Sequence, residues 1–165
     1  MVNSLPPIDG DAVVSTCGRY RYLLTRRWGE SAPLRFVMLN PSIADASVDD
    51  PTIRRCVWFA KREGCGGIEV ANLYAFRATK PDDLWRAPDP YGPDNDAALA
   101  SLAMRATADL MPVVCAWGTQ GGRNNRPIAL MQQAGAAFLC LGRTKDGFPR
   151  HPLYVPGTQR MEDYP

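Results

Sequence analysis

Two short loops, far apart in the sequence, each place a polar side chain directly before a proline. Asn40 precedes Pro41 after the apolar run 36–39, and His151, the only histidine, precedes Pro152. Proline confines the preceding residue to extended geometry, so both side chains have a narrow backbone range. An amide and an imidazole held in this way can act on one substrate, with the imidazole donating to a developing anion. Asn40 and His151 are therefore candidate catalytic residues.

Other polar side chains follow apolar runs. Asp45 is a candidate base or water-orienting group, whereas Asp50 is most simply a helix cap. Asn72 ends an apolar run, where a buried amide is costly unless it is paired. Its donor and acceptor suit the edge of a base or another amide-like ring, and a loop-fixing hydrogen bond is the alternative. Arg77 is placed to reach a phosphate or to form a surface ion pair.

A glycine-rich segment, residues 118–122, follows Trp117. Backbone N–H groups near a helix start, together with Arg123, favour an anion. The segment has neither the lysine of a P-loop nor the spacing of a dinucleotide fingerprint, and a tight turn that needs glycine accounts for it nearly as well. Ser42 lacks the flanking glycines of a hydrolase nucleophile elbow, so a role in binding fits it better.

The positioning elements follow from hydrophobic spacing and caps. Six runs predict strands: residues 12–15, 19–25, 36–39, 68–73, 113–117 and 137–141. The first two are expected to form an antiparallel hairpin that turns near Gly18. Four helices are expected: one from Pro51 to Gly64 with Asp50 as its cap, one over 81–85 with Thr79 as its cap, and two over 93–108 and 127–134.

Strands that alternate with helices predict an α/β fold with a mostly parallel central sheet and helices on both faces. Ligands of such folds bind outside the carboxyl ends of the parallel strands. Asn40, Asn72, the 118–122 loop and the segment 142–151 all leave predicted strand ends. We therefore expect these four segments to lie on one rim.

Composition sets further bounds. The chain has 165 residues and a net charge of +2, which fits one domain over 1–165, with residues 1–11 poorly ordered. The five cysteines form no Cys-x-x-Cys pair, so we expect no metal and no cofactor. Neither a membrane span nor a signal peptide is visible, which favours the cytoplasm. Residues 119–154 carry five basic side chains against one acidic, an asymmetry that permits a phosphate-facing surface.

Several motifs occur in an order that resembles a bacterial domain-of-unknown-function family, DUF 1643. The resemblance covers residues 19–156, nearly the whole chain, and brings no activity with it. Its motifs are Leu39-Asn40-Pro41-Ser42-Ile43-Ala44-Asp45, Asp50-Pro51-Thr52, Asn72-Leu73-Tyr74-Ala75-Phe76-Arg77-Ala78-Thr79, Ala116-Trp117-Gly118 and His151-Pro152-Leu153-Tyr154.

The same order of motifs is more distantly similar to the uracil-DNA glycosylase superfamily, which implies a three-layer α/β/α sandwich. That resemblance implies that Asn40 orients the attacking water, Asn72 recognises the base and His151 stabilises negative charge on the leaving base. It also implies that Leu153 approaches the duplex. Tyr74, Phe76 or Trp58 would supply the stacking platform, since no aromatic residue closely follows the first motif.

The sequence therefore predicts a glycosylase-like site for a nucleobase, with DNA or a nucleotide as partner. A non-catalytic nucleic-acid or nucleotide-binding module is the alternative, and hydrolysis of a small metabolite by His151 and Asp45 is a third. The oligomeric state stays open. Beside the catalytic candidates, the expected substrate-binding residues are Pro41, Ser42, Asn72, Tyr74, Arg77, Trp117, Gly118, Arg123 and Leu153.

Overall fold

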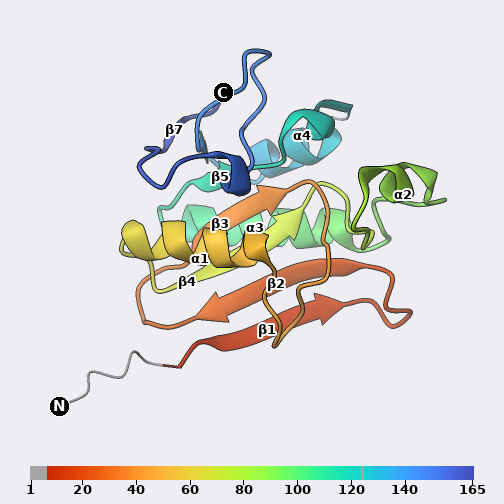
Figure 1. Cartoon of the computed structure of the whole chain (residues 1–165), viewed down its shortest axis with the longest axis horizontal. Helices are drawn as coiled ribbons and strands as arrows, with labels where there is room; N and C mark the ends of the chain where they lie inside the picture. Colours follow the sequence, from red (N-terminus) through yellow and green to blue (C-terminus); the bar gives the residue numbers. More distant parts are fainter. Residues whose placement is uncertain (1–6, 124) are drawn as a thin grey trace.

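The computed structural model describes residues 7–123 and 125–165 (Figure 1). Within these residues seven strands form one mixed sheet in the order β1-β2-β4-β3-β5-β6-β7, accompanied by four α-helices. The α/β class predicted from the sequence is confirmed. The strands are β1 (Asp9–Val14), β2 (Arg21–Arg27), β3 (Leu34–Met38), β4 (Gly67–Asn72), β5 (Val113–Cys115), β6 (Phe138–Cys140) and β7 (Glu162–Asp163).

Strand direction divides the sheet into a parallel centre and antiparallel edges. The four strands β4, β3, β5 and β6 run parallel to one another. β1 and β2 form the predicted antiparallel hairpin, β2 continues antiparallel onto β4, and β7 is antiparallel to β6. The parallel arrangement is therefore confined to the centre of the sheet. It brings the carboxyl ends of β3, β4 and β5 to the same edge of the sheet.

Side chains alternate between two apolar clusters, one on each face of the sheet. Phe36 and Met38 of β3 pack with Ile53 and Phe59 of α1 (Pro51–Arg62), while Val37 points to the other face. There it packs with residues of α3 (Asn95–Ala108) and α4 (Arg126–Gln133). This period of two is what a strand buried on both faces requires. Helices therefore cover both faces of the sheet.

Helix α1 begins as the sequence predicts. Asp50 adopts an extended conformation and its Oδ1 accepts from the backbone N–H of Ile53, 2.9 Å away, with Pro51 in the first turn. The predicted cap of α2 (Pro81–Arg86) is wrong: the N-cap position is Lys80, not Thr79, and no side chain caps it.

Some boundaries differ from those predicted. β1 starts at Asp9, so residues 9–11 pair with β2, and residues 1–6 lie outside the described part. The glycine-rich segment forms a short 3₁₀ helix, η1 (Thr119–Arg123), where a loop is predicted. A second 3₁₀ turn, η2 (Pro152–Tyr154), follows His151. In the part of the chain that the structure covers, each helix is too short or too polar to cross a bilayer.

Candidate functional site

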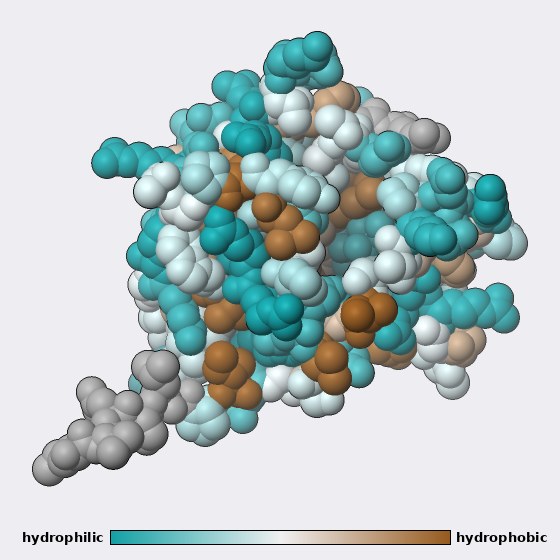
Figure 2. Space-filling model, in the orientation of Figure 1, coloured by the Kyte–Doolittle hydropathy of each residue, from teal (hydrophilic) through white to brown (hydrophobic). Residues whose placement is uncertain are grey.

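A cavity of about 570 Å³ opens where the parallel strands end, on the face that α1 covers. Figure 2 shows the surface hollowed above the ends of β3 and β4, with hydrophilic and apolar residues mixed around it. Its volume is in the range of small-molecule sites. The wall combines apolar side chains of the core (Met38, Ile53, Val70, Trp117) with a ring of polar ones (Arg21, Asn40, Ser42, Asp50, Thr52, Asn72, Thr79, Gln120, Thr144, Arg150, His151).

The two proline-restricted loops meet at this cavity. Asn40 and His151, 111 positions apart (151 − 40), both line it, as the expected common rim requires. Asn72 lines it from the end of β4. The remaining predicted binding residues in its wall are Ser42, Trp117, Gly118 and Leu153.

The amide nitrogen of Asn40 is used within the protein. Nδ2 donates to the carbonyl oxygens of Ala78, 2.7 Å away, and Pro41, 3.0 Å away. The backbone N–H of Ala78 donates in turn to Pro41 O, so the loop after β3 is tied to the segment after β4. Both hydrogens of Nδ2 are thereby occupied, which leaves Oδ1 as the acceptor that Asn40 can offer to a water or a substrate.

The hydrogen bond that His151 makes determines which nitrogen of its imidazole is the acceptor and which is the donor. Its Nδ1 accepts from the backbone N–H of Leu153, 3.2 Å away, and so caps η2. In a neutral ring with Nδ1 as acceptor, the proton resides on Nε2. Burial lowers the pKa of His151 below its ordinary value of 6.5, and the nearby Asp50 carboxylate opposes this only in part. Near neutral pH the ring is therefore a neutral N–H donor.

This lowered pKa predicts a loss of stability in mild acid. The unfolded chain titrates His151 near 6.5 and takes up the proton first, so the free energy of unfolding falls as the pH drops below 6.5. The fall ends once the pH is below the pKa in the folded state. Urea denaturation between pH 5 and 8 measures it. His151→Asn, which keeps a capping oxygen, should flatten the profile between pH 5 and 6.5; an unchanged profile would contradict the assignment.

One arginine of α1 holds the His151 loop in place. Arg55 donates to the carbonyl oxygens of Pro152 and Val155, at 3.1 and 2.6 Å. On the opposite side, the backbone N–H of Gly118 donates to Pro149 O, 2.9 Å away. Gly118 has a φ of +70°, a conformation that glycine adopts without strain. The loop is thus fixed both to the helix and to the end of β5.

The end of β4 is fixed by a buried amide that the sequence did not single out. Asn95, in the first turn of α3, donates through Nδ2 to the carbonyl oxygens of Asn72 and Leu73, at 3.0 and 3.2 Å. Asn72 itself is 1% exposed, and its Nδ2 has no hydrogen-bond partner among the residues that the structure describes. A buried donor without a partner in a cavity wall is a point where a ligand can bind.

Four predicted site residues do not line the cavity. Asp45 accepts from the backbone N–H groups of Ser47 and Val48 in a local turn, which lowers its pKa and weakens it as a base. Tyr74 is buried against Trp85, with ring centroids 5.0 Å apart. The other two are Pro41, which is buried, and Arg77, which donates to Gly18 O at 3.4 Å. The side chain of Arg123 lies outside the described part.

Three charged residues of the cavity wall were not predicted as site residues. Arg21 reaches it from the start of β2, Asp50 from the cap of α1, and Arg150 from the loop that ends at His151. The capping pattern concealed Asp50, because a cap alone accounts for an aspartate before Pro51. Arg21 gave no distinctive signal, because the same strand also contains Arg26 and Arg27.

Within the described ranges, no three histidine, cysteine, aspartate or glutamate side chains come together as a metal site. A family model described as "Protein of unknown function (DUF1643)" matches residues 21–153. Neither the curated proteins nor the solved structures contain a match to this chain.

Proposed function

The chain belongs to the DUF1643 family of proteins of unknown function, and we propose that it recognises a nucleobase in DNA or in a nucleotide and hydrolyses its N-glycosidic bond. The support comes from the cavity, whose wall combines a fixed acceptor, a fixed donor and a buried amide. These are the groups that such a hydrolysis needs.

The observation that carries this proposal is the hydrogen bond from Leu153 N–H to Nδ1 of His151. It leaves Nε2–H as a neutral donor in the wall that also contains Asn40. A donor that is already oriented stabilises developing negative charge without reorganisation during the reaction. A neutral imidazole also avoids holding a positive charge in a largely buried position.

In the proposed reaction the bond between the sugar carbon and the base nitrogen breaks, and its electron pair leaves with the base. Positive charge develops on the sugar and negative charge on the base, where His151 donates. A water held by Oδ1 of Asn40 forms the new bond to the sugar carbon and releases a proton to solvent. Asn72 contacts the base through its amide.

The rim suits a base delivered from a polymer as well as a free nucleotide. Leu153 and Tyr154 are 42% and 74% exposed and border the cavity. Exposed apolar groups beside a basic residue, here Arg150, are suited to a nucleic-acid chain from which one base has left the stack. A base bound within a duplex would have to be flipped out to reach Asn72.

We also propose that the architecture is a three-layer α/β/α sandwich of the uracil-DNA glycosylase kind. Its support is the placement of α1 on one face of the sheet and of α3 and α4 on the other. The order of the motifs along the chain agrees with it. This likeness concerns the fold, and it does not by itself assign a reaction.

One observation favours the second candidate, a binding module without catalysis. Asp45, the carboxylate expected as a base, is held in a local turn and does not line the cavity. The same observation counts against a small-metabolite hydrolase that uses His151 and Asp45. A module would bind single-stranded DNA or a nucleotide and release no base.

A base-release assay separates the two candidates. Full-length protein is incubated with single-stranded oligonucleotides that carry different modified bases and with mononucleotides, and free base is quantified by mass spectrometry. We expect release from at least one substrate. Binding at low salt without release of any base identifies the binding module. If the protein binds none of these substrates at low salt, both candidates are wrong, because phosphate contacts dominate the affinity for nucleic acids.

A further inference from the structure

Helix α1 and the segment that packs beside it concentrate basic side chains. Residues 51–62 and 150–161 contain six basic residues and no acidic one, whereas the rest of the chain has 13 basic residues against 17 acidic ones. Hydrogen bonds from Arg55 and Arg62 to carbonyl oxygens of residues 152–159 hold the two segments side by side (Figure 1). Much of the positive charge of the protein therefore lies on one surface.

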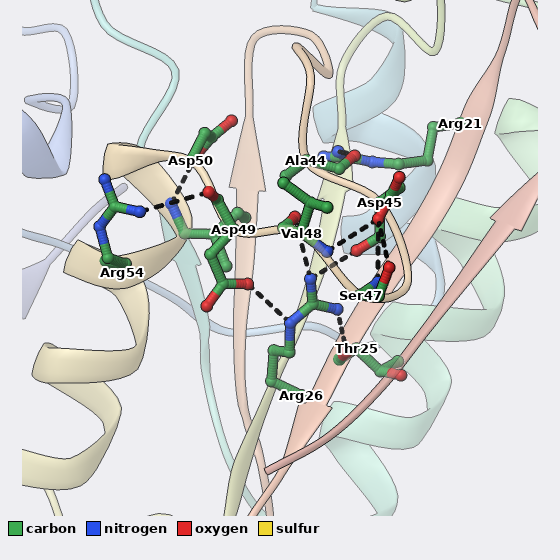
Figure 3. Close-up of polar contacts among 11 residues, drawn as sticks. Arg21, Thr25, Arg26, Ala44, Asp45, Ser47, Val48, Asp49, Asp50 and Arg54 are labelled. Atoms are coloured by element: carbon green, nitrogen blue, oxygen red, sulfur yellow. Dashed lines mark hydrogen bonds and ion pairs between the residues drawn. The ribbon is translucent and has the colours of Figure 1, made fainter.

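Most of this charge has no acidic partner within the protein. Of the six basic residues, Arg62 alone forms an ion pair, with Glu63, among the residues that the structure describes. Arg54 donates to the backbone carbonyl oxygen of Asp49, 3.3 Å away, whereas the carboxylate of Asp49 pairs with Arg26 (Figure 3). A bond to a neutral carbonyl group leaves the positive charge available to an anion.

Two exposed aromatic side chains lie among these basic residues. Trp58 is 44% exposed and Tyr154 is 74% exposed. Arg54, Trp58 and Lys61 are spaced i, i+4 and i+7, which places them on one face of the helix. The ring of Trp58 lies against Gly157, where an added Cβ atom would be 2.9 Å from it. Trp58 is therefore at the junction of α1 and the second segment.

We infer that this surface binds single-stranded nucleic acid, whose phosphates contact the basic side chains and whose bases contact the two aromatic rings. We define the basic strip as Arg54, Trp58, Lys61, Arg62, Tyr154 and Arg160. A positively charged track with aromatic side chains along it suits a single strand, because every base has a face that can stack. The bases of a duplex are stacked inside it and do not reach such rings. Helix α1 is about 18 Å long, a length that about five phosphates of one strand span.

The basic strip extends beyond the cavity. Tyr154 lines the cavity, whereas Trp58, Lys61 and Arg160 do not. Near the C-terminal end of α1, Arg160 lies beside Arg62 in an open groove. The inference therefore concerns a binding surface that leads away from the site of the proposed reaction, and it requires no hydrolysis.

The salt dependence of binding tests the phosphate contacts. A fluorescent oligothymidylate of about 12 nucleotides is titrated with full-length protein, and anisotropy is recorded between about 50 and 200 mM salt. The variant Arg54→Gln/Lys61→Gln/Arg160→Gln should bind about tenfold or more weakly at the lowest salt. The plot of log K against log salt should also be less steep by about 2, because each phosphate contact with a single strand contributes about 0.7 to that slope.

A second triple variant is the matched control. Arg19→Gln/Lys80→Gln/Arg86→Gln removes the same charge from exposed residues outside the strip and outside the cavity wall. This variant should change the affinity by about twofold at most, since exposed charges far from a ligand are screened by salt. Thermal unfolding reports whether each variant folds.

Oligomers without bases test the contacts with the aromatic rings. An abasic oligomer of the same length should bind the natural protein about fivefold or more weakly than oligothymidylate. Trp58→Ala/Tyr154→Ala should lose most of this difference, because the rings that contact the bases are gone. A duplex that contains the oligothymidylate should bind the natural protein more weakly than the single strand does.

Five outcomes overturn the inference. These are no binding of oligothymidylate at low salt, equal binding of the abasic oligomer, equal or tighter binding of the duplex, equal competition by an oligoglutamate of the same charge, and equal effects of the two triple variants. Equal competition by oligoglutamate would make the strip a site for acidic peptides. The first four use the natural protein, so a folding defect cannot obscure them.

The outcome for the strip is separable from the outcome for the proposed function. If oligomers bind as described but no base is released from any substrate, the hydrolysis is wrong and the strip stands. Release of base from mononucleotides, without binding of oligomers, would have the opposite meaning.

Discussion

His151→Asn is expected to slow base release by about 10² to 10³-fold, because it removes the Nε2–H donor from the leaving base. Asparagine is a good capping residue, so its side-chain oxygen should still accept from Leu153 N–H and keep η2 in place. The slope and midpoint of urea unfolding should therefore change little at neutral pH. Single-turnover release from the best substrate of the panel measures the rate, and calorimetry measures binding.

The alanine variant of His151 separates donation from capping. His151→Ala removes both the Nε2–H donor and the cap, so it should match the asparagine variant in rate but lose about 1 kcal/mol of stability as well. Release at the natural rate by a folded His151→Asn would remove the histidine from the chemistry. In that case the hydrogen bond to Leu153 would be its whole function.

The second large effect is expected at Asn40. Asn40→Ala removes the oxygen proposed to hold the attacking water, and we expect kcat to fall by about 10²-fold or more with a smaller change in KM. The substitution also removes the hydrogen bonds to Ala78 and Pro41, so some loss of stability accompanies it. Kinetics at a temperature well below the midpoint of thermal unfolding keep the two effects apart.

Asp45→Asn is the matched control for that experiment. Asp45 belongs to the same loop, but it accepts from Ser47 and Val48 rather than facing the cavity. The Asp45→Asn variant should release the base at the rate of the natural protein. If Asp45→Asn is as slow as Asn40→Ala, the loop rearranges on binding and the carboxylate takes part after all.

Much of the fold could be predicted from local sequence. Pro51 after Asp50 predicts the start of α1, and the apolar run 36–39 predicts a strand buried on both faces, because caps and periodicity act over a few residues. Element order then places strand ends on one edge, which brought Asn40 and His151 together as expected. The edge strand β7 was missed, since two residues carry no periodic signal.

The cavity's charged residues could not be predicted in the same way. The direction of Arg21 depends on one extra residue in β2, and pairing with β1 determines that register rather than anything in the strand itself. Asp45 and Asp50 are five positions apart and chemically alike, and only the path of the loop decides which carboxylate faces the cavity. Contacts between residues far apart in the sequence determine both the direction of Arg21 and which aspartate faces the cavity.

The segment fastened to α1 has a consequence for how the protein folds. Arg55 binds the turn after His151, and Arg62 binds the carbonyl oxygens of Gly157 and Gln159, about 95 positions later in the chain. Such distant closures form slowly, after local structure is in place. A ligand that needs both Asn40 and His151 would thus bind only molecules that have finished folding. The rate at which binding recovers during refolding would therefore report how fast this segment docks on α1. It is measured independently of the spectroscopic signal from the helices.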